Sequence, residues 1–151
     1  MNHCIRVAST PEVFLIDVPY PNVITRGTNV VKDGDDCLVV DLGAPSDEGY
    51  AYLMAAFDEL DIDPSCARYF LTHLHMDHAG LVDRVVPADA PLYLSRIDFE
   101  ASAFQRTDLF VQQLEDRIRA EGASESYMRE AAAQGLAHDC WISPERNLRF
   151  V

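Results

Sequence analysis

The sequence contains almost no lysine, no long apolar run and no closely spaced pair of cysteines. Lys32 is the single lysine, and 12 basic residues stand against 25 acidic ones, which gives a formal net charge of −13. A chain this negative repels phosphate backbones and anionic lipids, so we expect no nucleic-acid partner and no membrane partner. No apolar stretch approaches the roughly 20 residues that span a bilayer, and residues 1–10 lack the layout of a signal peptide.

Several kinds of site are also missing from the sequence. The four cysteines (Cys4, Cys37, Cys66 and Cys140) form neither a Cys-x-x-Cys motif nor a dense framework, so we expect reduced thiols in a cytoplasmic protein. There is no glycine-rich phosphate loop and no serine or cysteine nucleophile motif, and the acidic clusters at 33–36 and 58–63 lack calcium-loop spacing. With 151 residues, 48% of them hydrophobic, the chain is predicted to form one globular domain with a substantial core.

The first two thirds of the chain alternate between strand and helix patterns. We predict strands at 12–18, 23–31, 37–40, 67–71 and 91–94, the second of them broken or bulged near Gly27, with an Asp-Gly hairpin turn at 33–34. The continuous apolar run at 37–40 is typical of a strand buried on both faces. Ser46 or Asp47 caps a predicted helix whose apolar residues recur every three or four positions, and a short helix is predicted at 80–86. This alternation predicts an α/β layered fold.

After residue 95 the pattern is helical, with interruptions near Thr107 and Gly122. One apolar stripe at helical spacing is most simply core or lid packing; it comprises Phe104, Leu109, Phe110, Leu114 and Ile118. Residues 147–151 have the pattern of a beginning strand. We therefore divide the chain into a β/α part at 1–95 and a helical insertion or lid segment at 96–151.

One cluster of residues carries recognisable chemistry. Three of the five histidines, His73, His75 and His78, fall within six positions and have Asp77 among them. Imidazole and carboxylate groups are the ligands that zinc prefers, and iron and manganese also accept them. His73 and His75 are two apart on an extended segment and point to the same side, whereas Asp77 and His78 lie where a helix begins. One short loop can therefore offer ligands to two neighbouring metals. We favour this interpretation over a histidine-rich surface turn, because the spacing of the histidines and the aspartate is specific.

The motif His73-Leu-His75-Met-Asp77-His78 resembles the signature of the metallo-β-lactamase superfamily. The resemblance extends upstream to residues 29–31 and to the Asp-x-Gly turn at Asp41, and it covers residues 12–95. It implies an αββα sandwich, of which this chain supplies about half as a mixed sheet with flanking helices and a helical C-terminal segment. It also implies a hydrolase with two metal ions, zinc or else manganese or iron, in which a metal-bound hydroxide is the nucleophile.

The resemblance also implies roles for individual residues. His73 and His75 would ligate the first metal, and Asp77 and His78 the second. Asp77 would in addition act as the catalytic residue that handles the proton of the nucleophilic water and of the leaving group. Asp41 would orient the ligand loop from behind.

The later ligand motifs of that family have no counterpart after His78. His138, followed by Asp139 and Cys140, is a candidate replacement ligand, although a helix end is the simpler interpretation, and His3 lies near the terminus. Half a sandwich would leave one sheet face open to water. We therefore expect either that the protein was cut short or that a second chain supplies the missing half, and in both cases we expect self-association through the sheet.

Two functions follow from these observations. The first is a metal-dependent hydrolase of a thioester, lactone or other small acyl substrate, incomplete in this chain; an antibiotic-cleaving, RNA-processing or di-iron oxidoreductase member fits less well. The second is a catalytically silent half-domain that binds metal weakly or serves in self-association as a homo-oligomer. Turnover on thioesters and lactones with added metal, compared with a His75→Ala variant, separates them.

Overall fold

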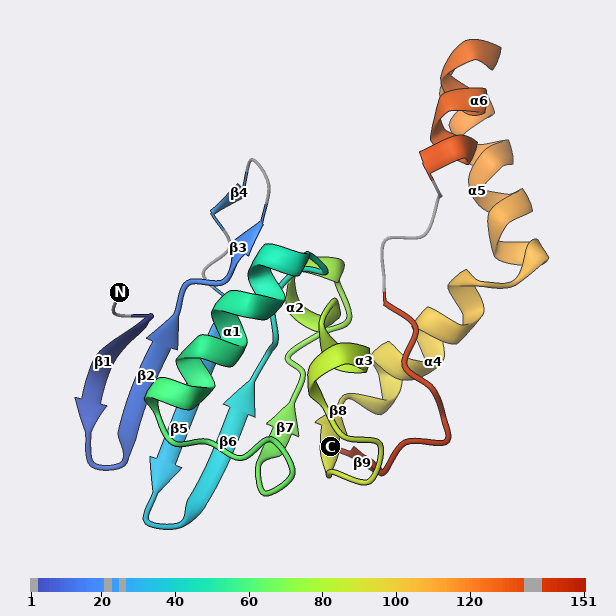
Figure 1. Ribbon diagram of the computed structural model, residues 1–151. Helices are drawn as coiled ribbons and strands as arrows, with labels where there is room; N and C mark the ends of the chain where they lie inside the picture. The colour runs from blue at the N-terminus through green and yellow to red at the C-terminus, as the bar shows by residue number, and fades with distance from the viewer. Residues whose placement is uncertain (1–2, 21–22, 25–26, 135–139) are drawn as a thin grey trace.

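The computed structural model describes residues 3–20, 23–24, 27–134 and 140–151. Its main element is a seven-stranded sheet with the strand order β1-β2-β5-β6-β7-β8-β9 (Figure 1). The strands are β1 (Cys4–Ser9), β2 (Glu12–Ile16), β5 (Thr28–Asp33), β6 (Asp36–Val40), β7 (Arg68–Phe70), β8 (Leu92–Leu94) and β9 (Leu148–Phe150), and a separate hairpin pairs β3 (Pro19–Tyr20) with β4 (Val23–Ile24). The helices are α1 (Asp47–Glu59), α2 (Met76–Ala79), α3 (Val82–Val85), α4 (Arg96–Gln105), α5 (Asp108–Ala120) and α6 (Glu125–Gln134). The chain thus has the α/β class that its sequence predicts.

The sheet changes character in its middle. Strands β1, β2, β5 and β6 pair antiparallel, and the predicted hairpin turn between β5 and β6 contains Gly34 with a φ of 61°. From β6 onward the strands run parallel, with Val40 opposite Phe70 and Phe70 opposite Tyr93. The carboxyl ends of β6 and β7 therefore lie at the same edge of the sheet, which is where ligands bind in open α/β sheets.

Helix α1 covers one face of the sheet and forms the main core with it (Figure 1). The helix begins as predicted, because the Ser46 hydroxyl accepts a hydrogen bond from the backbone N–H of Gly49 at 2.9 Å. Leu53 and Phe57, one turn apart, are fully buried against the sheet. The core-facing strand residues are likewise almost fully buried; they include Ile16, Val30, Val39, Tyr69 and Leu92.

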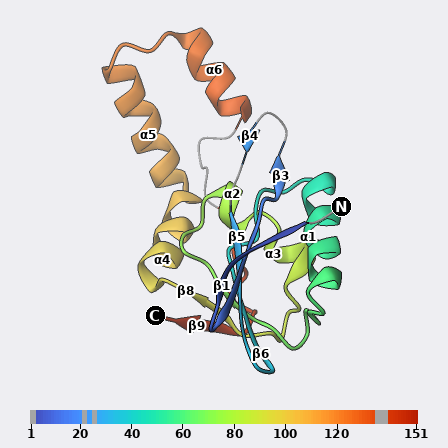
Figure 2. The ribbon, with the colours of Figure 1, turned by 90° about the vertical axis from the view of Figure 1, so that its left-hand side faces the viewer.

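The opposite face of the antiparallel strands is open. Along β6 only Val39 is buried, so the prediction that the apolar run 37–40 is buried on both faces is wrong. The reason is that α1 and α3 lie on one side of the sheet, whereas the helices on the other side, α4 and α5, lie beside β8 rather than behind β1, β2 and β5 (Figures 1 and 2). The cross-strand register places apolar residues on this open face, namely Ile5, Val13, Leu15, Val31, Leu38, Val40 and Phe70.

Two further predictions agree with the structure in outline. The predicted strand 23–31, with its break near Gly27, is two strands, β4 and β5, and the predicted helix 80–86 contains the shorter helix α3, which α2 precedes. Helix α2 stops at Ala79 because tertiary contacts hold its end: the carbonyl of His78 accepts a hydrogen bond from the backbone N–H of Leu42 at 2.7 Å. Strand β1 was not predicted at all, since it depends on pairing with β2.

The residues after Ser95 form a helical arm that returns to the sheet. Helices α4 and α5 begin at the capping side chains of Ser95 and Thr107, and α5 ends just before Gly122, which has a φ of 93°. Helices α5 and α6 project away from the sheet (Figures 1 and 2), and no residue of α5 is buried. The arm ends where β9 pairs parallel with β8. No helix among the described residues combines the length and apolar character needed to cross a membrane.

Candidate metal centre

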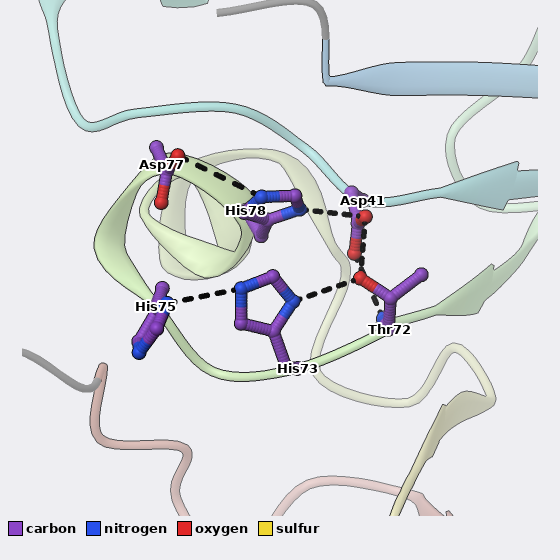
Figure 3. A network of polar contacts seen from close by, with 6 residues as sticks. All are labelled: Asp41, Thr72, His73, His75, Asp77 and His78. Carbon is purple, nitrogen blue, oxygen red and sulfur yellow. Dashed lines mark hydrogen bonds and ion pairs between the residues drawn. The ribbon is translucent and has the colours of Figure 1, made fainter.

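The ligand motif lies at the sheet edge where β6 and β7 end. Asp41 follows β6 directly, and Thr72 comes two residues after the end of β7. The chain from Thr72 then passes through His73 and His75 into α2, which carries Asp77 and His78 (Figure 3). The parallel pairing of β6 with β7 thus brings residues 31 to 37 positions apart in sequence into contact.

The carboxylate of Asp41 is the centre of a hydrogen-bond network (Figure 3). Its Oδ1 accepts the backbone N–H of Thr72 at 2.8 Å, and its Oδ2 lies 2.7 Å from the Thr72 hydroxyl and 2.8 Å from Nδ1 of His78. The side chain of Asp41 is only 5% exposed, so water competes little for these bonds. Asp41 therefore orients the loop from behind, in the position that the sequence suggested.

The imidazole rings converge in front of this network. Nε2 of His73 lies 3.1 Å from Nδ1 of His75, and the rings of His73 and His78 are 4.0 Å apart between centroids. His73, Asp77 and His78 each offer a ligand atom, and these three atoms lie within 4.8 Å of one another. With Nδ1 of His78 bonded to Asp41, its Nε2 faces Asp77, whose Oδ2 is 3.6 Å away. His75 lies outside this group of three and contacts it through the ring of His73.

Close backbone packing holds α2 against the end of β6. Gly43, which has a φ of 84°, forms a bridge with Ala79, and a Cβ on Gly43 would lie 2.8 Å from Val18. A Cβ on Gly80 would lie 2.3 Å from Cδ of Pro45. The absence of side chains at these two glycines allows the ligand helix to approach the strand end closely.

The four predicted ligands are thus neighbours in the structure. His138 and Asp139 lie outside the described residues. The backbone N–H of Cys140 donates to the carbonyl of Leu74 at 2.6 Å. This bond attaches the chain before β9 to the loop that carries His73 and His75. His3 contacts Glu59 instead. Sequence reasoning gave no role to Thr72, although its place directly before the first histidine was the signal that could have shown one.

Two of the four cysteines, Cys4 and Cys37, do not offer a competing nucleophile. Burial raises the pKa of the Cys4 thiol to about 11, and burial also raises the pKa of the Cys37 thiol against the opposing effect of Lys32 and Arg68. A thiol with a raised pKa is protonated at neutral pH and reacts slowly. None of the four cysteines forms a disulfide.

Comparisons with known proteins agree with this geometry. The family model described as the metallo-beta-lactamase superfamily matches residues 28–97. A metallo-beta-lactamase family protein from Thermus thermophilus is similar in structure, with 20% identity, a TM-score of 0.62 and coverage of 83% of this chain and 43% of that one. An N-acyl homoserine lactone hydrolase, with the product N-hexanoyl-L-homoserine bound at its catalytic metal centre, has 14% identity and a TM-score of 0.51, with coverage of 82% and 46%.

A quorum-quenching N-acyl homoserine lactone lactonase has 13% identity and a TM-score of 0.51. That match covers 99% of this chain and 54% of the lactonase. The chain therefore spans about half the length of these three solved structures or less. No curated protein matches the sequence. At these identities the structural likeness concerns the fold.

Proposed function

Because this chain is a member of the metallo-β-lactamase superfamily through residues 28–97, we propose that it contributes the ligand motif of a metal-dependent hydrolase. The observation that carries the proposal is the convergence of His73, His75, Asp77 and His78 at the edge of the sheet. Three imidazoles and one carboxylate, supported from behind by a buried aspartate, are more than a surface turn requires.

The donor set fits a zinc ion. Two nitrogens bound tetrahedrally at about 2.0–2.1 Å stand about 3.3 Å apart, and the facing nitrogens of His73 and His75 are separated by 3.1 Å. Asp77 and His78 offer an oxygen and a nitrogen to a neighbouring position. Manganese and iron accept the same donors, so zinc is the proposed occupant and these two are the alternatives. A bound divalent metal would supply Lewis acidity and lower the pKa of water.

Asp77 is the residue that we assign to proton handling. Its side chain is 49% exposed, in contrast to the buried Asp41, so it can meet a substrate that enters from solvent. Its carboxylate can accept a proton from water and donate it to a leaving group. His73, His75 and His78 hold the metal in this scheme and carry no proton to the substrate.

A small acyl compound, either a lactone or a thioester, is the proposed substrate class. Support comes from the two similar structures of enzymes that act on N-acyl homoserine lactones, although this likeness is one of fold. The net charge of −13 disfavours a polyanionic substrate such as RNA. The chain is proposed to require further ligands for full activity, because no other histidine, cysteine or acidic residue in the described part of the chain joins the group.

The open sheet face favours a second candidate function. Apolar residues of β2, β5 and β6, including Leu15, Val31 and Val40, share this face, and no described helix lies behind these strands. These side chains are partly exposed, and a contiguous apolar surface of this kind is typical of an association surface. We propose that, in the absence of catalysis, the chain is a self-association module whose partner is a second copy of itself.

One experiment separates the two functions. The purified chain is loaded with zinc or manganese and assayed on a panel of thioesters and lactones, beside His75→Ala and the control His3→Ala. Turnover that is lost in His75→Ala and kept in His3→Ala supports the hydrolase. Metal binding without turnover at any concentration of chain contradicts it for this chain.

Sedimentation then tests the module. A dimer that dissociates in Val31→Glu and persists in Val151→Glu supports association through the open face, because Val31 lies on that face and Val151 is an exposed residue beyond β9. A monomer at all concentrations of the unchanged chain contradicts it.

A further inference from the structure

The hydroxyl of Thr72 lies between the Asp41 carboxylate and the His73 ring. Its Oγ1 is 2.7 Å from Oδ2 of Asp41 and 3.0 Å from Nδ1 of His73 (Figure 3). A hydroxyl has one hydrogen to donate, whereas a carboxylate can only accept. The hydrogen of Thr72 is therefore directed to Asp41, and the free lone pairs of the hydroxyl face His73.

This direction determines which ring nitrogen of His73 carries the proton. The lone pairs of the Thr72 hydroxyl can only accept from an Nδ1–H of His73, and Nε2 is then left with its lone pair. We propose that Thr72 is a positioning residue that relays the charge of Asp41 to His73 and fixes the ring tautomer with which His73 binds metal. The effect on metal binding rests on the proposed function, whereas the assignment of the tautomer does not.

Asp41 thereby controls two ligands by different routes. It accepts the Nδ1–H of His78 directly at 2.8 Å, and it acts on Nδ1 of His73 through the hydroxyl of Thr72. In both rings Nδ1–H points toward the sheet and Nε2 points away from it. One buried carboxylate thus fixes the tautomers of two imidazoles, so that the Nε2 atoms of both rings are left free on the side away from the sheet.

A consequence appears at the facing ring nitrogens. Nε2 of His73 and Nδ1 of His75 are 3.1 Å apart, a distance at which two bare lone pairs repel. Since Nε2 of His73 is bare, the proton between the two rings is carried by Nδ1 of His75 in the metal-free chain. The relay therefore predicts the tautomers of three histidines together.

The test uses long-range proton–nitrogen NMR of the histidine rings in the metal-free chain. The spectra are recorded at mildly alkaline pH, and the ring nitrogen that carries hydrogen is assigned for each histidine. We expect His73, His75 and His78 each to carry the proton on Nδ1. Thr72→Val removes the hydroxyl but keeps the shape of the side chain and the backbone bond to Asp41, so we expect His73 to shift to a mixture of tautomers. Thr72→Ser restores the hydroxyl and should restore the tautomer.

Zinc affinity, measured by competition with a chelator, is the second readout. Loss of an outer hydrogen bond typically weakens metal binding 10- to 100-fold, and we expect about tenfold for Thr72→Val because Thr72 is exposed and water can partly replace the hydroxyl. Thr72→Ser should bind within about twofold of the unchanged chain. Thr28→Val is the matched control, since the buried Thr28 hydroxyl has no hydrogen-bond partner among the described residues.

The relay is overturned if His73 carries its proton on Nε2 in the unchanged chain. It is also overturned if Thr72→Val, folded by circular dichroism, leaves the His73 tautomer unchanged. The hydrolase proposal fails separately if the unchanged chain binds no zinc, because the tautomers are read without metal or substrate.

Discussion

Nδ1 of His78 lies 2.8 Å from the carboxylate of Asp41, although the two residues are 37 positions apart. Asp41, directly after β6, has a φ of 56°, a left-handed conformation that aspartate and asparagine tolerate better than most residues. Together with the backbone bond from Leu42 to His78 and the bridge between Gly43 and Ala79, this contact joins the end of β6 to α2. It therefore links the stability of the sheet edge to the geometry of the candidate metal centre.

Replacing Asp41 with asparagine tests this contact. The Asp41→Asn side chain keeps the left-handed backbone, but its amide cannot accept all three hydrogen bonds that converge on the carboxylate. We expect zinc affinity to fall about 10- to 100-fold and the free energy of unfolding to fall by about 1–3 kcal/mol. Chelator competition and urea denaturation measure the two effects.

The control for this change is Asp61→Asn. Asp61 also has a positive φ, 53°, but it is exposed and distant in sequence from the motif. Asp61→Asn should leave the zinc affinity and the free energy of unfolding unchanged. Equal losses in the two variants would contradict a specific role for the Asp41 carboxylate.

Gly80 is predicted to tolerate no side chain. Its φ of −64° suits any residue, but a Cβ there would lie 2.3 Å from Cδ of Pro45 and 2.4 Å from the carbonyl oxygen of Met76. Gly80→Ala should therefore displace α2 and lower the free energy of unfolding by about 3 kcal/mol, at the upper end of overpacking costs. Gly34→Ala, where nothing lies within 4 Å but φ is 61°, should cost about 1 kcal/mol. Urea denaturation of both variants compares the two losses of stability. A larger loss for Gly34→Ala than for Gly80→Ala would contradict the close packing of Gly80 against Pro45.

Thr28→Val is predicted to stabilise the chain. Thr28 is fully buried in β5, and its hydroxyl has no hydrogen-bond partner among the described residues. A buried unsatisfied polar group costs about 1–3 kcal/mol, and valine has the same shape without the hydroxyl. We expect a gain of about 1 kcal/mol in thermal or urea unfolding. A loss of stability would mean that the hydroxyl is satisfied.

The Cys4 thiol is predicted to make stability sensitive to alkaline pH. Burial, with a smaller contribution from Glu59, raises its pKa from 9.0 to about 11. The folded state therefore favours the protonated thiol, so its contribution is fully present below pH 9 and is lost as pH rises toward about 11. The loss across this range is of the order of 2 kcal/mol, since one pKa unit corresponds to about 1.4 kcal/mol.

Urea denaturation between pH 8 and pH 11 checks this expectation. Cys4→Ala should show a shallower decline over that range than the unchanged chain, whatever its stability at pH 8. The exposed Cys66 serves as the control, and Cys66→Ala should keep the full decline. Identical slopes for Cys4→Ala and the unchanged chain would contradict the raised pKa.

Elements with local signals could be predicted from the sequence. The Ser46 cap and the apolar spacing of Leu53 and Phe57 specify α1 through contacts within a few residues, and the Asp-Gly turn specifies the β5–β6 hairpin. The α/β class and the histidine motif were readable for the same reason. Strand β1 was not, because its two exposed apolar residues, Ile5 and Val7, give no sign of burial and the strand exists only through pairing with β2.

The sequence by itself therefore determined the types of the candidate ligands, their order and the helices and turns around them. Only the tertiary structure decided how they meet. Parallel pairing of β6 with β7 brought Asp41 to Thr72 and His78, and close packing at Gly80 fixed the ligand helix. The open face of the sheet was decided in the same way, because the side of a strand that is covered depends on where distant helices lie. Contacts across 30 or more residues leave no periodic signal in the sequence, and these contacts give Thr72 its place in the centre.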